Sequence, residues 1–395
     1  MADRKDCPIS IQPNLPLYGI KVVEVSEGVS GPYCGKLLAA MGAEVIKVEM
    51  PPNGDFARST GPFLPRKEDL ENSALFLHNN TGKKSVLLDW STVSGSKALE
   101  SMLSGADLLI ENWNSTYRET TGIGRERFTA CHPELIEICI TPFGLDGPYS
   151  RWKSAPIVQL ALGGIMNIIG DPKSDPLMIP GHHAEYLTGI NGCNASMIAL
   201  WKRDFSGNGA FLELSEMETL ANLHQAPLNM EGGIRKRSSH RQSSLSERGF
   251  PPGVATLAAK DGYLTFGGGS QAIWEQLCLM LERTDLYEGK DFSDLTSNED
   301  LDRLVDRIIE DWMDGKIRSE VFREVSEEWL LPVAPVLSIG EVLSDKQFIH
   351  RNSFQEIDHP SAGKASYPLP PPLIDGDRLP LTRAPLLGEH TMEYL

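Results

Sequence analysis

The chain has 395 residues, of which 41% are apolar and 23% charged, and its formal net charge is −17. This length favours two domains over a single core, and the acidic balance argues against a nucleic-acid-binding protein, which needs a basic face. The balance still allows a local basic pocket for an anionic ligand, because nearby charges outweigh distant, screened ones. No run of about 18 apolar residues predicts a membrane span, and residues 1–6 lack the apolar core of a signal peptide.

The six cysteines are scattered along the chain without a CxxC pair. Several lie in apolar runs and are typical of small core residues. This pattern favours a reducing, cytoplasmic location and argues against disulfides or a zinc site. Since the sequence also lacks HExxH and EF-hand motifs, we expect no bound metal.

The N-terminal half alternates predicted strands with helices. Residues 1–16 are polar and contain proline, which predicts a loose arm, and β-branched runs at 19–25 and 44–49 predict two strands. A helix is predicted between them, from Tyr33 to Met41. A β-loop-α-β unit of about 30 residues is typical of an α/β fold with a doubly wound parallel sheet.

The turn between the first strand and its helix is the first candidate binding element. It contains Val29 and Ser30, between Gly28 and the pair Gly31-Pro32. A helix start of this kind suits an anion. The turn lacks the GxGxxG motif, so it gives little support to a dinucleotide site.

Two lysines form a second candidate binding element. Lys83 and Lys84 follow two asparagines and a glycine, and they directly precede a predicted strand at 86–90. The group is either a phosphate site or a solvated turn.

A third candidate element follows the strand predicted at 106–111. Asn112 and Trp113 come next in the chain, at the carboxyl edge where ligands bind in such sheets. Arg118 and Arg125 follow closely and add positive charge.

Further elements complete the predicted large domain. Helices are expected at 94–103 and 156–169, the second of them buried, and strands at 133–141 and 207–214. A last helix is expected at 216–228.

The stretch 180–200 contains one carboxylate, Glu185, after a Pro-Gly breaker and before an apolar run rich in small residues. Its spacing predicts a buried helix that begins near Glu185, and Gly189 and Gly192 allow another backbone to approach closely. Backbone N–H groups and the helix dipole favour an acid at a helix start. Glu185 is therefore either a helix-terminus anchor or a working group.

The C-terminal half begins with a change in composition. Residues 231–250 are basic, serine-rich and without periodicity, and they lack interleaved aromatic residues, so they predict a linker. A strand at 261–266, three glycines at 267–269 and a helix at 272–281 then open a second unit. Glycines between a strand and a helix fit either a mobile lid or a plain loop.

The order of several short motifs resembles that of the family III CoA-transferases, the group of formyl-CoA transferase and carnitine CoA-transferase. The likeness runs from Leu15 to Leu395; each motif is weak alone, and their order and spacing together carry the resemblance. The motifs lie at 19–25, 31–32, 41–49, 80–89, 111–113, 133–136, 143–149, 207–209 and 384–390.

The resemblance implies an architecture that periodicity alone does not predict. It implies a large doubly wound domain built from both ends of the chain, a smaller α+β domain, and an interlocked homodimer. The expected division is an arm at 1–16, the first part of the large domain at 17–230, a linker at 231–250, the small domain at 251–335, and a linker with a C-terminal return to the large domain at 336–395.

The resemblance also implies a CoA site. The family binds CoA in the large domain and holds the acyl end near a glycine-rich loop that matches Gly267, Gly268 and Gly269. The family's catalytic carboxylate aligns with Glu185. On this basis we expect CoA to contact Val29, Ser30, Lys83, Lys84, Asn112, Trp113, Arg118 and Arg125.

Two departures from the family pattern concern this site. The family has Asp where this chain has Glu185, and the extra methylene moves the carboxylate by about 1.5 Å, a misplacement that can lower the rate about 100-fold. Either the pocket is reshaped around Glu185 or the chemistry has changed. The racemase branch places a His-Asp pair where this chain has Ala155-Pro156, and His182 or His183 is the candidate replacement.

The predicted activity is transfer of CoA from an acyl-CoA thioester to a carboxylic acid. Glu185, ionised at neutral pH, attacks the thioester carbonyl and forms a mixed anhydride; the thiolate returns to form a glutamyl-CoA thioester, which the acceptor acid resolves. The N–H groups of Gly267–Gly269 and of the helix start are expected to stabilise the oxyanions, and Gln159 is expected to orient Glu185. Two alternatives stay open: an acyl-CoA isomerase, hydratase or lyase that uses Glu185 as general acid/base, and a non-catalytic acyl-CoA-binding homologue.

Overall fold

The computed structural model describes residues 15–64, 69–123, 127–170, 174–223, 256–267, 270–288 and 299–395. These residues form two compact units. The large unit draws its residues from Met1–Ile165, Met178–Gly233 and Gln347–Leu395, and the small unit draws its residues from Met166–Leu177 and Ile234–Lys346. Most of the predicted arm, the predicted linker 231–250 and the end of the helix predicted at 216–228 lie outside the described residues.

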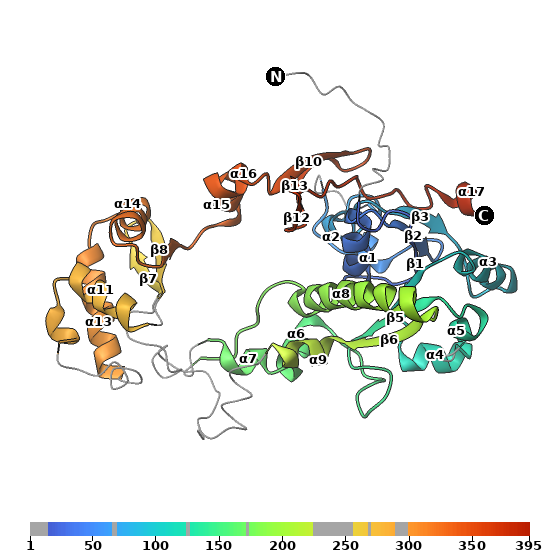
Figure 1. Cartoon of the computed structure of the whole chain (residues 1–395), viewed down its shortest axis with the longest axis horizontal. Helices are drawn as coiled ribbons and strands as arrows, with labels where there is room; N and C mark the ends of the chain where they lie inside the picture. The colour runs from blue at the N-terminus through green and yellow to red at the C-terminus, as the bar shows by residue number, and fades with distance from the viewer. Residues whose placement is uncertain are drawn as a thin grey trace, which may run out of the picture. The chain divides into compact units, whose positions relative to one another are not determined.

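A six-stranded parallel sheet forms the centre of the large unit (Figure 1). The strand order is β3-β2-β1-β4-β5-β6, with Val22 of β1 opposite both Val45 of β2 and Leu108 of β4. Such a sheet is stable only when both faces are covered. The strands are β1 (Lys21–Glu24), β2 (Glu44–Glu49), β3 (Lys84–Leu87), β4 (Leu108–Glu111), β5 (Ile136–Thr141) and β6 (Ala210–Ser215).

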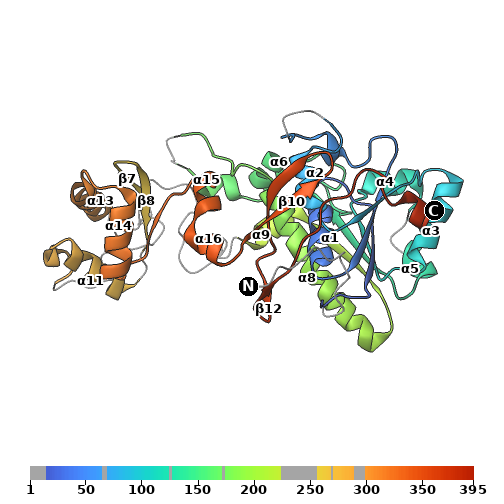
Figure 2. The same ribbon diagram turned by 90° about the horizontal axis from the view of Figure 1, so that it is seen from above.

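Helices cover both faces of this sheet (Figure 2). Val22 packs with side chains of α1 (Ser30–Ala40) and α8 (His183–Ser206). Its neighbour Val23 points the other way, because side chains alternate along a strand, and packs with α3 (Val93–Leu103) and α5 (Arg127–Cys131). Further helices of this unit are η1 (Phe56–Ser59), α2 (Ala74–Asn79), α4 (Ser115–Thr121), α6 (Pro156–Leu162) and α9 (Glu216–Asn222).

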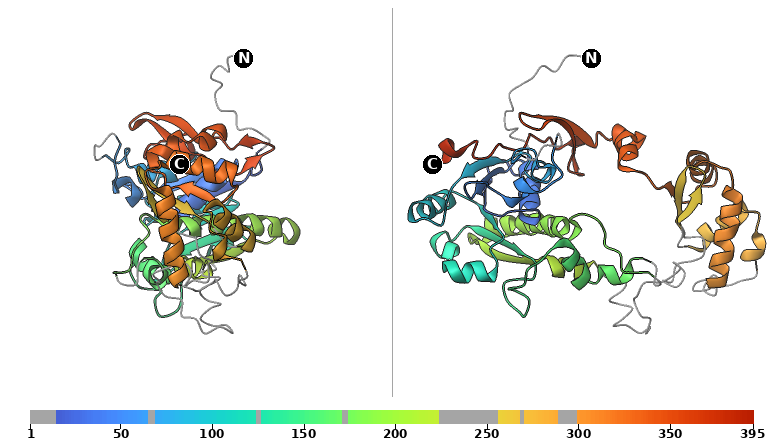
Figure 3. Two further views of the ribbon diagram at one scale, coloured as in Figure 1. Left: turned by 90° about the vertical axis from the view of Figure 1, so that its left-hand side faces the viewer. Right: turned by 180° about the vertical axis from the view of Figure 1, so that it is seen from behind.

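The C-terminal segment returns to the edge strand β3 (Figure 3, right). Thr391 Oγ1 accepts a hydrogen bond from the backbone N–H of Leu87 at 3.0 Å, and the backbone N–H of His390 donates to the carbonyl of Ser85 at 2.9 Å. The large unit therefore contains both the first strand and the last helix of the described chain. The elements of this segment are α16 (Lys346–His350), the antiparallel pair β10 (Phe354–His359) and β11 (Gly363–Pro368), the pair β12 (Leu373–Ile374) and β13 (Asp377–Arg378), and α17 (Thr391–Tyr394).

The small unit packs helices on a three-stranded antiparallel sheet. Its buried core includes Phe266, Trp274 and Ile309, one from a strand and two from helices. Strands β7 and β9 were not predicted, whereas β8 and α11 lie close to the strand and the helix predicted at 261–266 and 272–281. The elements are β7 (Thr256–Ala259), β8 (Gly262–Phe266), α11 (Gln271–Met280), η3 (Thr284–Leu286), α13 (Glu299–Met313), α14 (Arg318–Arg323), η4 (Glu324–Glu328), β9 (Val333–Pro335) and α15 (Ile339–Ser344).

Two predicted buried helices differ from the structure. The helix predicted at 156–169 divides into α6 and α7 (Ile165–Ile168) at Gly163-Gly164, where Gly164 has a φ of +82°; only Gln159 and Leu160 of α6 are buried. The helix predicted from 180–200 forms as α8, but its outer face exposes apolar residues such as Ile198. In the described part of the chain, no helix has both the length and the apolarity to cross a bilayer.

Candidate active site

Three helix starts of the large unit bring the site residues together. Ser30 begins α1 after the turn that follows β1, and Glu216 begins α9 directly after β6. Both residues therefore lie at the carboxyl edge of the parallel sheet, where ligands bind in folds of this class. Glu185 lies in the first turn of α8, which packs on both α1 and α9.

Two glycines of α8 allow this close packing. A Cβ atom on Gly189 would lie 2.7 Å from the carbonyl oxygen of Ser30, and one on Gly192 would lie 3.3 Å from Sγ of Cys34. The first distance is too short for a real contact, so α8 reaches the start of α1 only with glycine at 189. The close backbone approach predicted from the sequence is confirmed.

Glu185 has one satisfied and one unsatisfied carboxyl oxygen. Its Oε1 lies 3.2 Å from Nδ1 of His182, while its Oε2 is buried and has no hydrogen-bond partner among the described residues. The hydrogen bond to Glu185 raises the pKa of His182. His183, the predicted catalytic histidine, is exposed, and the contact to Glu185 comes from its neighbour His182.

A second carboxyl group, Glu216, belongs to the same region. Its Oε1 accepts a hydrogen bond from Ser30 Oγ at 2.9 Å, and its side chain is buried. Burial, and then the charge of Glu185, raise the pKa of Glu216 to about 7. Sequence analysis missed this residue; the available signal was an acid immediately after a predicted strand, at the edge where ligands bind.

Aromatic side chains pack beside Glu185. The ring of Tyr186 lies edge-on to Tyr33 with centroids 4.8 Å apart, and also edge-on to His78 at 5.9 Å. Lys36 Nζ lies 3.4 Å from His78 Nδ1, and burial lowers the pKa of Lys36 to about 7.

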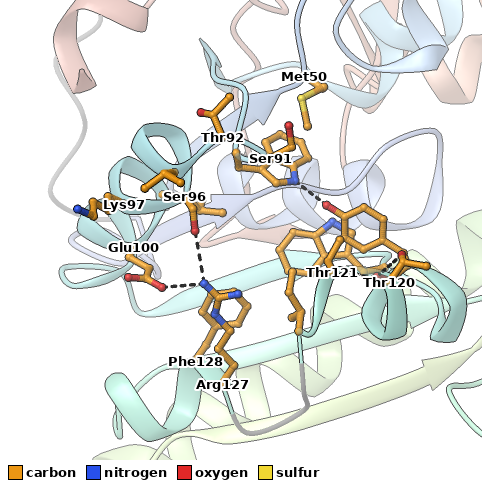
Figure 4. A pocket seen from close by; sticks show the side chains of 16 residues that line it. Met50, Ser91, Thr92, Ser96, Lys97, Glu100, Thr120, Thr121, Arg127 and Phe128 are labelled. Atoms are coloured by element: carbon orange, nitrogen blue, oxygen red, sulfur yellow. Dashed lines mark hydrogen bonds and ion pairs between the residues drawn. The ribbon is translucent and has the colours of Figure 1, made fainter.

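A cavity of about 640 Å³ opens at the carboxyl ends of β2, β3 and β4 (Figure 4). Met50, Trp90 and Trp113, which follow these three strands, contribute to its lining. Trp113 stacks on Tyr117 with centroids 5.6 Å apart, and Trp90 Nε1 donates a hydrogen bond to Tyr117 Oη at 2.9 Å. The lining also contains charged groups: Lys97, and Arg127, whose half-exposed guanidinium pairs with Glu100 of the same lining at 2.9 Å.

The structure does not fit the predicted phosphate contact of Lys83. The lysine is buried, and its Nζ donates to Glu24 Oε2 at 2.8 Å, to the carbonyl of Pro32 at 2.7 Å and to Asn80 Oδ1 at 2.9 Å. Burial lowers the pKa of Lys83 to about 8. Its ammonium group is therefore bound to protein acceptors and is not free to contact a phosphate.

Two other predicted cations also have protein partners. Arg118 is buried, and its Nη2 pairs with Glu111 and with Glu137, the latter at 2.8 Å. Lys84 is half-exposed and lies 2.9 Å from Glu44 Oε1. Arg125 lies outside the described residues.

The remaining predicted residues of the large unit have structural contacts. Asn112 Nδ2 donates to the carbonyl of Glu27 at 3.0 Å, which holds the turn after β1. Val29 is buried at the start of α1, where its carbonyl accepts the N–H of Tyr33 at 2.8 Å. Gln159 is buried and donates to Ser154 Oγ at 2.6 Å; among the described contacts its side chain has none to Glu185.

The glycine-rich loop belongs to the small unit. Gly267 donates its N–H to the carbonyl of Pro332 at 2.7 Å, so this group is not available to an oxyanion. The predicted role of Gly267 as a donor therefore conflicts with its geometry. Gly268 and Gly269 lie outside the described residues.

Comparison with known proteins adds to this geometry. A model of CoA-transferase family III matches residues 17–391. The chain belongs to CoA-transferase family III. It is therefore an enzyme, a CoA-transferase.

Two curated relatives and one crystal structure indicate its place in the family. Succinyl-CoA:glutarate CoA-transferase of Mus musculus is 28% identical, over 96% of this chain and 86% of its own length. The succinyl-CoA–L-malate CoA-transferase beta subunit of Chloroflexus aurantiacus is also 28% identical, over 96% and 93%. A CAIB/BAIF family protein from Brucella suis is 28% identical, with a TM-score of 0.80 over 96% of this chain and 98% of its own.

Proposed function

We propose that the enzyme transfers CoA from an acyl-CoA thioester to a carboxylic acid by covalent catalysis at Glu185. The observation that carries this proposal is the buried, unpartnered Oε2 of Glu185 at a helix start, beside the carboxyl edge of the sheet. A buried carboxylate oxygen without a partner retains its nucleophilic lone pairs. We take succinyl-CoA as the first donor to test, because it is the CoA ester in the names of both curated relatives.

The proposed reaction has three steps. Oε2 of Glu185 attacks the thioester carbonyl, the C–S bond breaks, and a mixed anhydride and CoA thiolate form. The thiolate attacks the glutamyl carbonyl, which releases the donor acid and leaves CoA bound to Glu185 as a thioester. The acceptor carboxylate repeats these steps in reverse, which regenerates the Glu185 carboxylate and yields the new acyl-CoA.

The protein groups have separate roles in this proposal. The first N–H groups of α8, which have no intrahelical partners, lie in the same turn as Glu185 and are the proposed oxyanion donors. His182 holds Oε1, which leaves Oε2 to react. We assign the CoA nucleotide to the aromatic cavity, because its volume suits a nucleotide and its lining includes two cationic side chains, Lys97 and Arg127.

We also propose that the enzyme is an interlocked homodimer, as the family resemblance implies. A supporting observation is the exposed apolar face of α8, where Ile198, Trp201 and Phe205 are 67%, 66% and 76% exposed. Helix faces of this kind are normally covered by a partner. Sedimentation of the purified enzyme tests the proposal: a species of twice the chain mass supports it, and a monomer contradicts it.

A half-reaction tests the covalent proposal. The enzyme, succinyl-CoA and labelled succinate are mixed without any second acid. The covalent route predicts that label enters succinyl-CoA, that Glu185→Gln abolishes this exchange, and that the exposed Glu218→Gln on α9 leaves it intact. Full exchange by Glu185→Gln would rule out the route.

One observation favours a second candidate function. Glu185 and the protonatable Glu216 are two carboxyl groups in one site, and such a pair also suits proton transfer at the acyl chain of a CoA thioester. This isomerase-type reaction needs no acceptor acid. Uptake of deuterium from heavy water into an acyl-CoA, without any acid added, would distinguish it from CoA transfer.

A further inference from the structure

Glu216 is a buried carboxyl group to which the proposed reaction gives no role. It is 7% exposed, and Ser30 Oγ donates to one of its two oxygens at 2.9 Å. No cation pairs with it among the described residues. A second acid near a proposed carboxylate nucleophile has a direct consequence, because two ionised carboxylates in one pocket repel each other.

The ionisable groups that act on Glu216 lie at the start of α8: Glu185 in its first turn and His182 directly before it. After burial, the charge of Glu185 has the largest effect, and His182 opposes it. Helix α6 also packs on α9 and carries no ionisable side chain, and α1 contributes the neutral hydroxyl of Ser30. On β6, Glu213 is exposed and accepts the N–H of Leu145 at 2.7 Å.

A buried carboxyl group with one hydrogen bond from a neutral hydroxyl, and with no paired cation in the described part of the chain, favours its protonated form. Burial and the charge of Glu185 raise the pKa of Glu216 to about 7, while the hydrogen bond from Ser30 lowers it. A carboxyl group in this state holds its proton in mild acid and loses it in mild alkali. The charge of the site therefore changes near neutral pH.

We propose that Glu216 is a positioning residue of the Glu185 site: its protonated carboxyl adds no second negative charge beside Glu185, and its ionisation suppresses the reaction. The inference rests on the proposed function, because it gives Glu185 the attack on the thioester.

The physical reason lies in the charge that develops during the reaction. Attack by Glu185 puts negative charge on the thioester oxygen and then on the departing thiolate sulfur. With Glu216 protonated, the single charge of Glu185 moves onto the substrate. With Glu216 ionised, the same steps occur beside a second, buried negative charge, and charge interactions are stronger in a protein interior than in water.

The test combines a pH–rate profile with a spectroscopic titration. We expect kcat/KM for succinyl-CoA to fall about tenfold per pH unit above a pH of about 7. Glu216→Gln resembles the protonated acid in shape and charge, so the fall of kcat/KM at alkaline pH (the alkaline limb) should disappear in this variant. The exposed Glu218→Gln on the same helix should retain the alkaline limb. Ser30→Ala removes a hydrogen bond that lowers the pKa of Glu216 and moves the limb to higher pH.

Infrared spectroscopy provides a readout that does not need turnover. The wild-type enzyme is expected to show a carboxylic-acid C=O band that disappears as pH rises through about 7, and Glu216→Gln is expected to lack it. In Glu185→Gln the band titrates at lower pH, because the charge that raises the pKa of Glu216 is gone.

Two results would overturn the inference: an unchanged alkaline limb in Glu216→Gln, or no carboxyl band that titrates near neutral pH. Failure of the covalent function looks different. In that case Glu185→Gln retains full succinate exchange, while the infrared titration still decides whether Glu216 is protonated. If Glu216→Gln does not fold, the Ser30→Ala profile and the infrared titration decide the question together: an alkaline limb that stays in place while the band moves would also overturn the inference.

Discussion

Replacing Glu24 with glutamine tests the buried charge cluster under the active site. Glu24 on β1 pairs with Lys47 Nζ at 3.0 Å and with Lys83 Nζ at 2.8 Å, and all three side chains are fully buried. Asp55 pairs with Lys47 at 2.8 Å and completes two positive and two negative charges. Glu24→Gln keeps the shape of the side chain and leaves the cluster with one net positive charge. Lys83 is the ammonium group that loses its carboxylate partner.

The cluster also holds the turn that carries Ser30. Lys47 Nζ donates to the carbonyl of Ser26 at 2.8 Å, and Lys83 Nζ donates to that of Pro32 at 2.7 Å. Breaking a buried ion pair from one side typically costs about 3–5 kcal/mol, a large part of the about 5–15 kcal/mol that stabilises a typical protein. We expect that loss of unfolding free energy, together with lower CoA-transferase activity.

The sign of the pH dependence follows from Lys83. Burial already lowers its pKa to about 8, and loss of Glu24 lowers the pKa further. A lysine with a lowered folded-state pKa binds its proton more tightly in the unfolded chain. The unfolding free energy that Glu24→Gln loses relative to the wild type is therefore largest at low pH. The loss shrinks as pH rises, by at most about 1.4 kcal/mol per pH unit.

Urea denaturation and hydrogen exchange of peptides from β1 and β2 measure this loss. The control is Glu44→Gln, which breaks a half-exposed pair with Lys84 and is expected to cost at most about 1 kcal/mol. The double variant Glu24→Gln/Lys83→Met restores charge neutrality and is expected to recover part of the loss. Equal, small effects of Glu24→Gln and its control would refute the reasoning.

Three further predictions concern the site. Glu216 has a raised pKa of about 7 in the folded protein, so its proton stabilises the folded state at low pH by about 3 kcal/mol, and this stabilisation is lost as pH rises towards 7. Glu216→Gln removes it, and urea denaturation should therefore give the variant a flatter curve of unfolding free energy against pH. Parallel curves for the variant and the wild type would contradict this. Glu185→Asp draws the carboxylate back about 1.5 Å from its position and should lower kcat/KM about 100-fold; wild-type rates would show that the pocket tolerates the shorter acid. Tyr117→Ala removes an aromatic face of the cavity and should weaken CoA binding about tenfold in calorimetry, while the exposed Trp152→Ala should not; equal affinities would place the nucleotide elsewhere.

Local patterns predicted most of the central sheet. The β-branched runs of β1 and β2 favour strands once they are buried. The glycines of α8 predicted a close contact between helices, which Gly189 makes with Ser30. Glu185 was identified because it is the one acid at the start of a long apolar stretch. The exposed face of α8 was not predicted, since periodicity does not distinguish a core face from a face that awaits a partner.

Contacts between distant residues account for what the sequence did not predict. Lys83 resembles a phosphate ligand in its local sequence, and its actual partner Glu24 lies 59 residues away. Glu216 acquires its significance only from Ser30, 186 residues away, and from Glu185. Such pairings depend on the parallel orientation of the strands, which brings the carboxyl ends of β1 and β6 to the same side of the sheet, and no short motif records them.

Trapping the acyl-enzyme tests the central proposal most directly. The enzyme is incubated with succinyl-CoA, hydroxylamine is added, and the digested protein is mapped by mass spectrometry. Covalent catalysis predicts a hydroxamate at Glu185 that forms only when the CoA ester is present. An active enzyme that acquires no adduct at Glu185, or acquires it at a different side chain, would contradict the account.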